Sequence, residues 1–384
     1  MKIKISEALG YALIDNNVKV ITHVPGFGVS ETIQEYSVLA EKPVPLSFNE
    51  EVAYTISHGA GLVGQRSSLI IKAHGILKAA NSVMDSLYTD ITAGFVVIIF
   101  DDKTGKHSDN ILDVVPILKG FSLPYMVAED GDYYGSVGKA FAESEKRKLP
   151  VALIIDSAVI NNSINVERQE VVKKNYRFLR DVLSHVVHPM FAEYQFKNFT
   201  AKTLGGNPEQ ILRPQIPKFP DSLPDRYKAT AKKYIPFFDA FKNVRGQIVT
   251  GDTSISSSFC MPPYNAIDLV TYIGGSIPLA IGAYLSGVKD VWALTGDFGF
   301  LSAGHMGLLE TFNRGLPIKI VIFYNKQASA TGGQSIQNKI MSKVLSGYDK
   351  FIAHITNPND LIEITEVLKE VKKSETLRII LINY

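Results

Sequence analysis

The stretch Leu294–Gln334 reads LTGDFGFLSAGHMGLLETFNRGLPIKIVIFYNKQASATGGQ. Asp297 directly follows one short apolar run, and Asn325 directly follows a second. A helix-like segment, residues 303–313, lies between the two runs and ends at the sequence Arg-Gly-Leu-Pro. This pattern predicts a strand–helix–strand unit of a parallel sheet, with an acid at the end of one strand and an amide at the end of the next.

These two polar residues indicate a metal site. The carboxyl ends of parallel strands line one crevice, so the side chains of Asp297 and Asn325 are expected to lie close together. Carboxylate, amide and main-chain carbonyl oxygens are the ligands that Mg²⁺ or Ca²⁺ prefers, and Mg²⁺ usually also takes oxygens from a phosphate group. The pattern therefore predicts a site for a metal ion with a diphosphate.

The same stretch resembles the diphosphate-binding motif of the thiamine diphosphate (ThDP) enzymes. That motif begins with Gly-Asp and ends with Asn after roughly 25–30 residues, and here the separation is 325 − 297 = 28 residues. The resemblance implies that Asp297 and Asn325 bind the metal through their side chains and Gln327 through its carbonyl oxygen. A Rossmann-like unit without a cofactor is the plainer alternative.

Bulk properties limit the classes of protein to consider. The chain has 384 residues, which predicts two domains or slightly more. Its net charge of +2 gives no electrostatic reason to expect a nucleic acid or an anionic membrane as partner. The single cysteine, Cys260, excludes an intrachain disulfide framework and any four-cysteine zinc or iron–sulfur site.

Two segments bear on localisation. The N-terminal sequence MKIKISEALGYALIDNN lacks the long apolar core of a signal peptide. The longest uncharged run, Leu269–Val288, contains four glycines and a proline, which favours a buried helix over a membrane span. We therefore expect a cytoplasmic protein that does not associate with membranes.

The chain divides by composition into three parts. Residues 161–240 are rich in lysine, arginine, asparagine and proline and are expected to form an irregular linker with one or two short helices. Residues 1–160 and 241–384 alternate between strand-like and helix-like segments, including an expected helix at Glu51–Val63. The expected strands of the first half are Val18–Thr22, Val44–Phe48, Ser68–Lys72, Phe95–Phe100 and Val151–Ile155. The fold class is therefore α/β, with two doubly wound parallel-sheet domains.

The resemblance extends to the first half. Val24-Pro25-Gly26 is similar to a Val-Pro-Gly turn of ThDP decarboxylases, and Asn49-Glu50-Glu51-Val52-Ala53 is similar to the indolepyruvate–ferredoxin oxidoreductase α chain. This implies a pyrimidine-binding (Pyr) domain at 1–160 and a diphosphate-binding (PP) domain at 241–384. It also implies that Glu50 hydrogen bonds to the pyrimidine ring and promotes loss of the thiazolium C2 proton.

A simpler interpretation of this segment is helix capping. Asn49 would be an N-cap, and Glu50 and Glu51 would complement the helix dipole. Adjacent residues on a helix point about 100° apart, so only one of the two glutamates can face a cofactor.

Two histidines are candidate proton donors. His74 lies in an expected glycine-containing loop after the third strand. His107 lies in the stretch 101–108, which resembles the Asp-Asp…His-Ser loop of the 2-oxoacid oxidoreductase α chain. Ordinary solvated loop histidines are the alternative. A hydrolase triad is rejected, because its members normally come from distant positions and no nucleophile elbow is present.

The second half adds further candidate contacts. Thr253 and Ser254 end a strand and are expected to meet the diphosphate, Ile273 is expected to separate the two cofactor rings, and the carbonyl of Thr271 is expected to accept from the pyrimidine amino group. The cofactor-binding residues implied by the resemblance are Pro25, Gly26, Glu50, Thr253, Ser254, Thr271, Ile273, Gly296, Asp297, Phe298, Gly299, Asn325 and Gln327.

Three functions are compatible with these features. The first is a ThDP- and Mg²⁺-dependent (or Ca²⁺-dependent) 2-oxo acid decarboxylase or carboligase, because the length and two-domain plan resemble phosphonopyruvate and sulfopyruvate decarboxylases. The second is the catalytic subunit of a 2-oxoacid oxidoreductase that passes electrons to a separate iron–sulfur protein, since the sequence ends at Tyr384 without a ferredoxin-like tail. The third is a degenerate ThDP fold that acts as a binding module, against which the intact Glu50, Asp297 and Asn325 argue.

The resemblance also implies an assembly. In ThDP enzymes the pyrimidine is held by one chain and the diphosphate by its partner, so we expect a homodimer or homotetramer with active sites between subunits.

Overall fold

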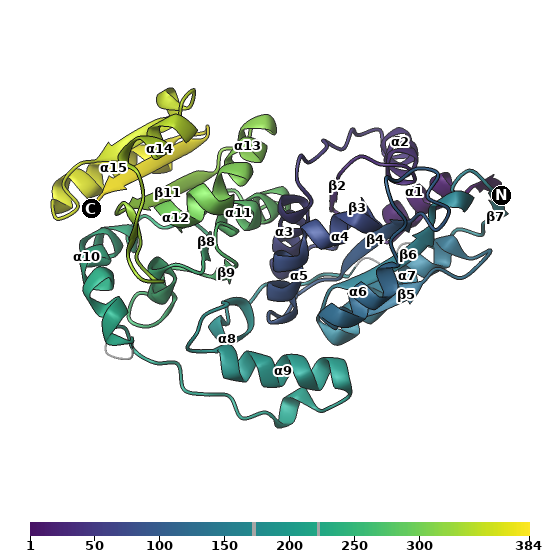
Figure 1. The fold of residues 1–384 in the computed structure, drawn as a ribbon, viewed down its shortest axis with the longest axis horizontal. Helices are drawn as coiled ribbons and strands as arrows, with labels where there is room; N and C mark the ends of the chain where they lie inside the picture. The colour runs from purple at the N-terminus through teal and green to yellow at the C-terminus, as the bar shows by residue number, and fades with distance from the viewer. Residues whose placement is uncertain (171–173, 221–222) are drawn as a thin grey trace. The chain divides into compact units, whose positions relative to one another are not determined.

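The computed structural model describes residues 1–170, 174–220 and 223–384. The chain forms two compact units (Figure 1). Unit 1 comprises Met1–Leu179 and Asn198–Pro208, and unit 2 comprises Arg180–Lys197 and Glu209–Tyr384. Each unit contains one parallel sheet with helices packed on it, which confirms the predicted α/β fold class.

The sheet of unit 1 has five parallel strands in the order β2-β3-β4-β6-β5. Their buried, β-branched sequences suit a sheet that is covered on both faces. The strands are β2 Val20–His23, β3 Ser67–Lys72, β4 Phe95–Asp101, β5 Tyr125–Val127 and β6 Val151–Asp156. A separate antiparallel pair joins β1 (Lys2–Lys4) to β7 (Ser163–Asn165).

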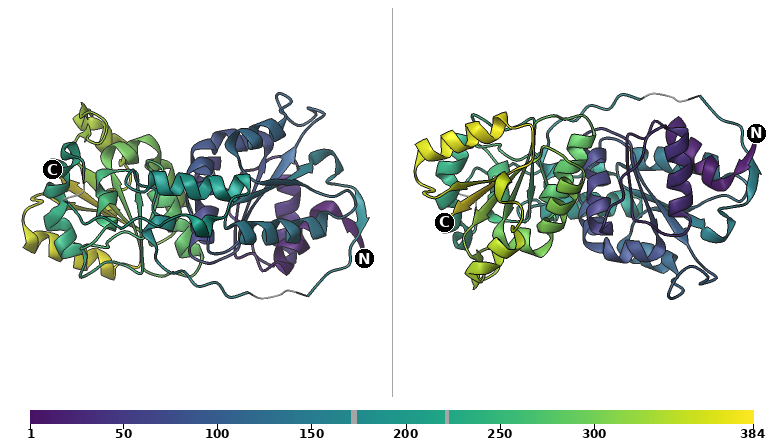
Figure 2. Two further views of the ribbon diagram at one scale, coloured as in Figure 1. Left: turned by 90° about the horizontal axis from the view of Figure 1, so that it is seen from below. Right: turned by 90° about the horizontal axis from the view of Figure 1, so that it is seen from above.

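Helices cover both faces of this sheet (Figure 2). Alternate strand residues such as Val96, Ile98 and Phe100 share one buried cluster with residues of α1, α2 and α7. On the opposite face, helix α3 contacts strands β2 and β3, and helix α4 contacts strands β3 and β4. The helices are α1 Ile5–Asp15, α2 Val29–Leu39, α3 Glu50–Leu62, α4 Ala73–Lys78, α5 Ala80–Leu87, α6 Val114–Phe121, α7 Tyr133–Arg147 and the 3₁₀-helix η1 Ser157–Val159.

The sheet of unit 2 has six parallel strands in the order β14-β15-β11-β10-β8-β9. The strands are β8 Ile248–Asp252, β9 Leu269–Thr271, β10 Val291–Gly296, β11 Lys319–Tyr324, β14 Ile352–Ile355 and β15 Arg378–Asn383. A short antiparallel pair, β12 (Gln327–Ala328) with β13 (Gln334–Ser335), follows β11.

Unit 2 is held by an aromatic core. Phe237, Phe238 and Phe241 of α10 pack with the sheet residues Trp292 and Phe323. The helices are α8 Val182–His185, α10 Asp225–Phe241, η3 Ile255–Cys260, α11 Ser276–Leu285, α12 Asp297–Gly299, η4 Phe300–Gly304, α13 His305–Asn313, α14 Asn338–Val344, η5 Asp349–Phe351 and α15 Leu361–Lys373. Helices α9 (Ala192–Leu204) and η2 (Pro208–Gln210) contain the boundaries between the units.

One predicted strand of unit 1 is wrong. Residues 44–48 form an irregular segment, and their main chain meets β2 through a hydrogen bond that Ser47 N donates to His23 O over 2.9 Å. Pro43 and Pro45 lack N–H donors, so this apolar segment cannot form a regular ladder with a neighbour. The sheet instead gains β5, which was not predicted.

The long uncharged run Leu269–Val288 is also not one helix. It divides into β9, a turn and α11, which places the run in the core of unit 2. The turn contains Gly274 at a φ of +84°. Pro278 lies in the first turn of α11, where its missing N–H costs no intrahelical hydrogen bond.

The helix after β10 begins earlier than predicted. It runs without interruption from Asp297 through the π-helical turn η4 to Asn313, and not from residue 303. Phe298 N donates to the Asp297 carboxylate over 2.8 Å, so the acid itself starts the helix. Among the helices of the described residues, none is long and apolar enough to cross a lipid bilayer.

We predict that Gly274 is essential for the stability of unit 2. A Cβ at this position would lie 2.5 Å from Gly299 O and 2.7 Å from Gly304 N, in a backbone conformation with positive φ. Gly274→Ala should therefore lower the free energy of unfolding by about 3 kcal/mol, measured by urea titration.

The matched control is Gly287→Ala. Gly287 has a φ of +103°, and a Cβ there would have no heavy atom within 4 Å. In this variant only the unfavourable backbone conformation lowers the free energy of unfolding, by about 1 kcal/mol. Equal losses in the two variants would show that the close approach of Gly274 to the helix start is unimportant.

Candidate functional site

The strand order of unit 2 places a crevice between β8 and β10. The chain leaves β8 towards β9 on one side and leaves β10 towards β11 on the other. Ligands of open α/β sheets bind at such switch points, outside the carboxyl ends of the strands. Here the strand ends carry Asp252, Thr253 and Ser254 on one side and Gly296 and Asp297 on the other.

The carboxylate of Asp297 is buried and held by main-chain donors. Its Oδ1 accepts from Phe298 N over 2.8 Å, and its Oδ2 accepts from Lys326 N over 2.5 Å. Only 2% of Asp297 is exposed. Burial raises the pKa of Asp297, while the N–H groups of Lys326 and Phe298 act in the opposite direction.

Asn325 lies beside this carboxylate, directly after β11. Its Oδ1 accepts from Gln327 N over 3.1 Å, and its Nδ2 donates to the hydroxyl of Tyr234 over 2.9 Å. Lys326 has a φ of +62°, so the chain turns sharply between Asn325 and Gln327. The predicted residues Asp297, Asn325 and Gln327 are thus brought together.

A second acid lies under this group. Asp252 Oδ2 accepts from Thr295 Oγ1 over 2.5 Å and from Gly274 N over 3.0 Å, and burial raises the pKa of Asp252. Its Oδ1 is buried without a hydrogen-bond partner among the described residues. Gly299 allows this packing, because a Cβ there would lie 2.4 Å from Asp252 Oδ2.

These groups surround a narrow hollow of about 70 Å³, which is room for a few water-sized groups. Thr271 is buried at the end of β9 and does not line it. The predicted residues that line the hollow are Thr253, Ser254, Ile273, Gly296, Asp297, Phe298, Gly299, Asn325 and Gln327; Tyr234, Ile255, Ser256, Phe323 and residues 328–331 complete it.

The donor set fits a metal ion with a diphosphate. Hard oxygen ligands are present at Asp297 and Asn325, and hydroxyls are present at Thr253 and Ser254. Asp297 begins a helix, whose positive end favours an anion. No group of three or more His, Cys, Asp or Glu side chains in the described residues is placed to hold a metal. Besides the Asp297 carboxylate, a metal here would therefore depend on amide, main-chain and ligand oxygens.

In unit 1 the two glutamates at the start of α3 differ in surroundings. Asn49 caps the helix by accepting from Glu51 N and Val52 N. The Glu50 side chain is 18% exposed and lies 3.5 Å from Lys78 Nζ. A Cβ at Gly75 would lie 3.0 Å from Glu50 Cγ, so Glu50 packs against α4. Burial raises the pKa of Glu51, whose hydrogen bond with Asn81 acts in the opposite direction.

The loop that carries His107 is organised by Asp102. Its Oδ2 accepts from His107 N over 2.7 Å and from Ser108 Oγ over 2.9 Å, and its Oδ1 accepts from Thr104 Oγ1 over 3.0 Å. Burial acts to raise the pKa of Asp102, but these hydrogen bonds and the charge of Lys72 outweigh it and bring the pKa to about 2. Lys72 also donates to Ser108 Oγ over 2.6 Å. The loop is therefore an ordered structure.

Both predicted histidines lie at this end of the sheet. The exposed His107 ring stacks on Phe27 with ring centroids 3.6 Å apart. Residues 73–78 form helix α4 where a loop was expected, and His74 on this helix lies 2.6 Å (Nε2) from Asn110 Oδ1 of the His107 loop. The helix formers alanine, isoleucine, leucine and lysine outweigh Gly75 here.

The predicted Pro25–Gly26 turn joins the same cluster. Pro25 is exposed, and a Cβ at Gly26 would lie 2.7 Å from Lys72 Cγ and Cδ. Unit 1 therefore gathers the Pro25–Gly26 turn, Glu50, His74 and His107 after strands β2, β3 and β4.

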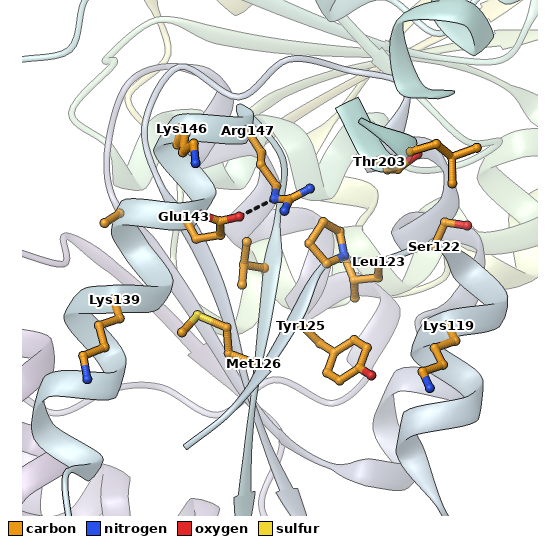
Figure 3. Close-up of a pocket in the computed structure, with 14 residues that line it drawn as sticks. Lys119, Ser122, Leu123, Tyr125, Met126, Lys139, Glu143, Lys146, Arg147 and Thr203 are labelled. Atoms are coloured by element: carbon orange, nitrogen blue, oxygen red, sulfur yellow. Dashed lines mark hydrogen bonds and ion pairs between the residues drawn. The ribbon is translucent and has the colours of Figure 1, made fainter. Parts of the chain in front are cut away.

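A wider hollow lies elsewhere on unit 1 (Figure 3). It has a volume of about 850 Å³ and lies along β5 between α6 and α7. Lys119, Lys139 and Lys146 are exposed around it, and Arg147 is paired with Glu143 over 2.5 Å. None of the predicted site residues lines it. Exposed lysines that no hydrogen bonds hold toward a common point do not identify a catalytic site. The smaller hollow of unit 2 is therefore the candidate functional site.

Two residues of the unit 2 site were missed by the sequence analysis. Tyr234 lay in the segment expected to be a linker, although Tyr234, Phe237, Phe238 and Phe241 follow the i, i+3, i+4, i+7 pattern of a buried helix face. Asp252 is the last residue of β8, in the sequence Gly-Asp-Thr-Ser. Only Thr253 and Ser254 of this stretch were expected to meet the diphosphate. Its position at the end of a buried strand could have identified Asp252 from the sequence.

Solved structures with this fold cover nearly the whole chain. Benzoylformate decarboxylase from Polynucleobacter necessarius superposes with a TM-score of 0.67 at 10% identity, over 99% of this chain and 98% of that one. The thiamine diphosphate-dependent 4-hydroxybenzoylformate decarboxylase of Rhodococcus jostii gives a TM-score of 0.68 at 12% identity, over 99% and 98%. At such identities the likeness establishes the fold alone.

Sequence comparison is more specific. Residues 250–378 match the family described as thiamine pyrophosphate enzyme, C-terminal TPP binding domain. The indolepyruvate oxidoreductase subunit IorA of Methanothermobacter thermautotrophicus is 32% identical over 152 residues, or 38% of this chain and 25% of that protein. IorA of Archaeoglobus fulgidus is 29% identical over 182 residues, or 44% and 29%.

This chain thus matches only about a quarter of the length of its curated relatives. The predicted resemblance to ThDP enzymes is confirmed by these matches. The matched domain and the curated relatives together show that this chain is similar to thiamine diphosphate enzymes, and among them to the indolepyruvate oxidoreductase subunit IorA.

Proposed function

We propose that this chain is a ThDP- and Mg²⁺-dependent enzyme that decarboxylates a 2-oxo acid or joins the product to an aldehyde. The observation that carries this proposal is the pairing of Asp297 and Asn325 at adjacent strand ends, in one hollow with the hydroxyls of Thr253 and Ser254. Hard oxygen ligands beside a helix start suit a metal with a diphosphate. Ca²⁺ suits the same ligands and could replace Mg²⁺.

Unit 2 would hold the metal and diphosphate. Asp297 and Asn325 would bind the metal through their side chains and Gln327 through its carbonyl oxygen. Thr253, Ser254 and the main chain of Gly296, Phe298 and Gly299 would meet the rest of the cofactor. Ile273 also lines the hollow, which suits a role against the cofactor rings. Thr271 would act only through its carbonyl, since its side chain is buried outside the hollow.

Unit 1 would hold the pyrimidine. Pro25 and Gly26 would approach the ring, and Glu50 would share a proton with a ring nitrogen. His74 and His107 would donate protons to the reacting molecule. The main-chain N–H of His107 donates to Asp102, and the His74 ring lies beside Asn110 of the same loop. We retain residues 1–160 as the pyrimidine-binding region and 241–384 as the diphosphate-binding region, with 161–240 between them.

When CO₂ leaves, the electron pair of the C1–C2 bond stays on C2 and must be stabilised there. ThDP would supply that stabilisation when bound, because its thiazolium ring can take up the electron pair. The C1–C2 bond of the acid breaks, CO₂ leaves, and a proton replaces it to give an aldehyde. A histidine that moves this proton must lie within hydrogen-bonding reach of the former carbonyl carbon, which is the role proposed for His107 or His74.

The substrate proposal follows the names of similar proteins. The structural neighbours are named for benzoylformate and 4-hydroxybenzoylformate, and the curated relatives are named for indolepyruvate. All three compounds are 2-oxo acids with an aromatic group. We therefore infer an aromatic 2-oxo acid as the substrate class.

A second function is favoured by the curated relatives. They are named as oxidoreductase subunits, which suggests that two electrons pass from the substrate to a partner. Residues 1–384 contain one cysteine, Cys260, which is buried, so these residues cannot themselves hold a four-cysteine cluster, and the proposed electron acceptor is an iron–sulfur protein.

A substrate panel separates these functions. The chain, with ThDP and Mg²⁺, should release CO₂ from benzoylformate, indolepyruvate or a related 2-oxo acid without an added electron acceptor. Release only when an artificial acceptor is present would establish the oxidoreductase instead. Binding of ThDP without either reaction would indicate a binding module. EDTA or Asp297→Ala should abolish the activity if the metal site is as proposed.

We predict that Glu50 activates the cofactor and that Glu51 does not. Glu50→Gln keeps the shape of the side chain but cannot share the proton, so turnover should fall by about 10²–10⁴-fold. Glu51→Gln retains a hydrogen-bonding amide next to Asn81 and should have a mild effect. Steady-state rates of the two variants decide the matter, and the reverse ranking would transfer the role to Glu51, whose pKa is raised by burial.

We further propose a homodimer or a homotetramer, in which Glu50 of one copy and Asp297 of another complete each site. Inactive Glu50→Gln and inactive Asp297→Ala chains, mixed in equal amounts and allowed to exchange, should regain about a quarter of the original activity. Half of the dimers would be mixed, and one of their two sites would be intact. Lack of recovery after demonstrated exchange would contradict the shared site.

A further inference from the structure

The hollow of unit 2 contains a tyrosine with a specific contact to a proposed metal ligand. Tyr234 belongs to α10, is 3% exposed and lines the hollow. Its hydroxyl oxygen lies 2.9 Å from Asn325 Nδ2, although the two residues are 91 positions apart in the sequence.

The two contacts of Asn325 determine which way its amide faces. The main-chain N–H of Gln327 can only donate, so the atom 3.1 Å from it must be the oxygen Oδ1. The nitrogen Nδ2 then faces Tyr234, whose hydroxyl oxygen accepts from it. An inverted amide would bring two donors together at Gln327, so the hydrogen-bond network itself assigns the orientation.

Tyr234 is itself held in place. Its ring packs on Phe323 with centroids 4.6 Å apart and on Tyr384 with centroids 4.7 Å apart. The following helical turns pack into the core through Phe237, Phe238 and Phe241. The hydroxyl therefore has a fixed position relative to the end of β11, as a supporting residue of a functional site requires.

We propose that Tyr234 is a positioning residue for Asn325. Its hydroxyl accepts from Asn325 Nδ2 and so keeps Asn325 Oδ1 turned toward the metal. The inference rests on the proposed function, because it assumes that Asn325 is a metal ligand. An amide oxygen has two lone pairs, and Gln327 N uses only one of them. The second is left for the metal ion.

The test is Tyr234→Phe, which keeps the ring and its packing and removes only the oxygen. With ThDP present, the affinity for Mg²⁺ measured by calorimetry should fall about tenfold, since one buried hydrogen bond to the ligand amide is lost. Mn²⁺ should behave alike when followed by its paramagnetic resonance signal. Both readouts are independent of turnover.

The matched control is Tyr324→Phe. Tyr324 is also buried, directly precedes Asn325, and donates to Asn338 O over 3.0 Å. It does not line the hollow. This variant loses a comparable hydrogen bond and should keep the metal affinity of the original protein. Thermal unfolding of both variants shows whether either loses its fold.

A double variant shows whether the hydroxyl acts through the orientation of the amide. Asn325→Asp replaces the amide with a carboxylate, whose two oxygens are equivalent, so no orientation needs to be kept. Adding Tyr234→Phe to Asn325→Asp should therefore cause little or no further loss of metal affinity. The same tenfold loss in both backgrounds would mean that the hydroxyl of Tyr234 acts independently of the orientation of the Asn325 amide, and would overturn the inference.

The remaining outcomes are also decisive. If the original protein binds ThDP with Mg²⁺ and Tyr234→Phe binds both equally well, only the role of Tyr234 is overturned. If the original protein and Asp297→Ala both fail to bind ThDP in the presence of Mg²⁺, the proposed function fails and this inference fails with it.

Discussion

The carboxylate of Asp297 connects the ends of two neighbouring strands. One oxygen accepts from Phe298 N at the helix start after β10, and the other accepts from Lys326 N in the turn after β11. A buried carboxylate without such donors would be costly. With them, it fixes the distance between the two strand ends, and that distance sets where Asn325 and Gln327 lie relative to the acid.

The aromatic face of α10 is the second support of this arrangement. Phe237, Phe238 and Phe241 bind the helix to the sheet, and Tyr234 on the same face reaches Asn325. The average composition of residues 161–240 is polar, which led to the expectation of a linker. The lysines of α10 lie on its outer side, however, and the spacing of its aromatic residues is that of a core helix. Averaging over a long window hides this periodicity.

Local patterns predicted much of the fold and the arrangement after β10 and β11, because strand ends and helix starts are set by nearby residues. The predicted strand at Val44–Phe48 failed for a local reason, since Pro43 and Pro45 remove donors. By contrast, the division of Leu269–Val288 depends on the close approach of Gly274 to Gly299 and Gly304. The contact of Tyr234 with Asn325 likewise depends on how distant segments pack, which a single sequence does not specify.

The start of α3 marks another limit of sequence reasoning. Glu50 and Glu51 have the same chemistry and the same helix end, and the N-cap Asn49 serves both interpretations. Only packing distinguishes them: Glu50 lies against Gly75 and near Lys78, whereas burial raises the pKa of Glu51 beside Asn81. A bound ring nitrogen would share a proton with whichever glutamate it reaches. The activating role therefore belongs to the glutamate whose side chain points at the bound ring. The direction of the side chain matters more for this than the pKa of either glutamate in the chain alone.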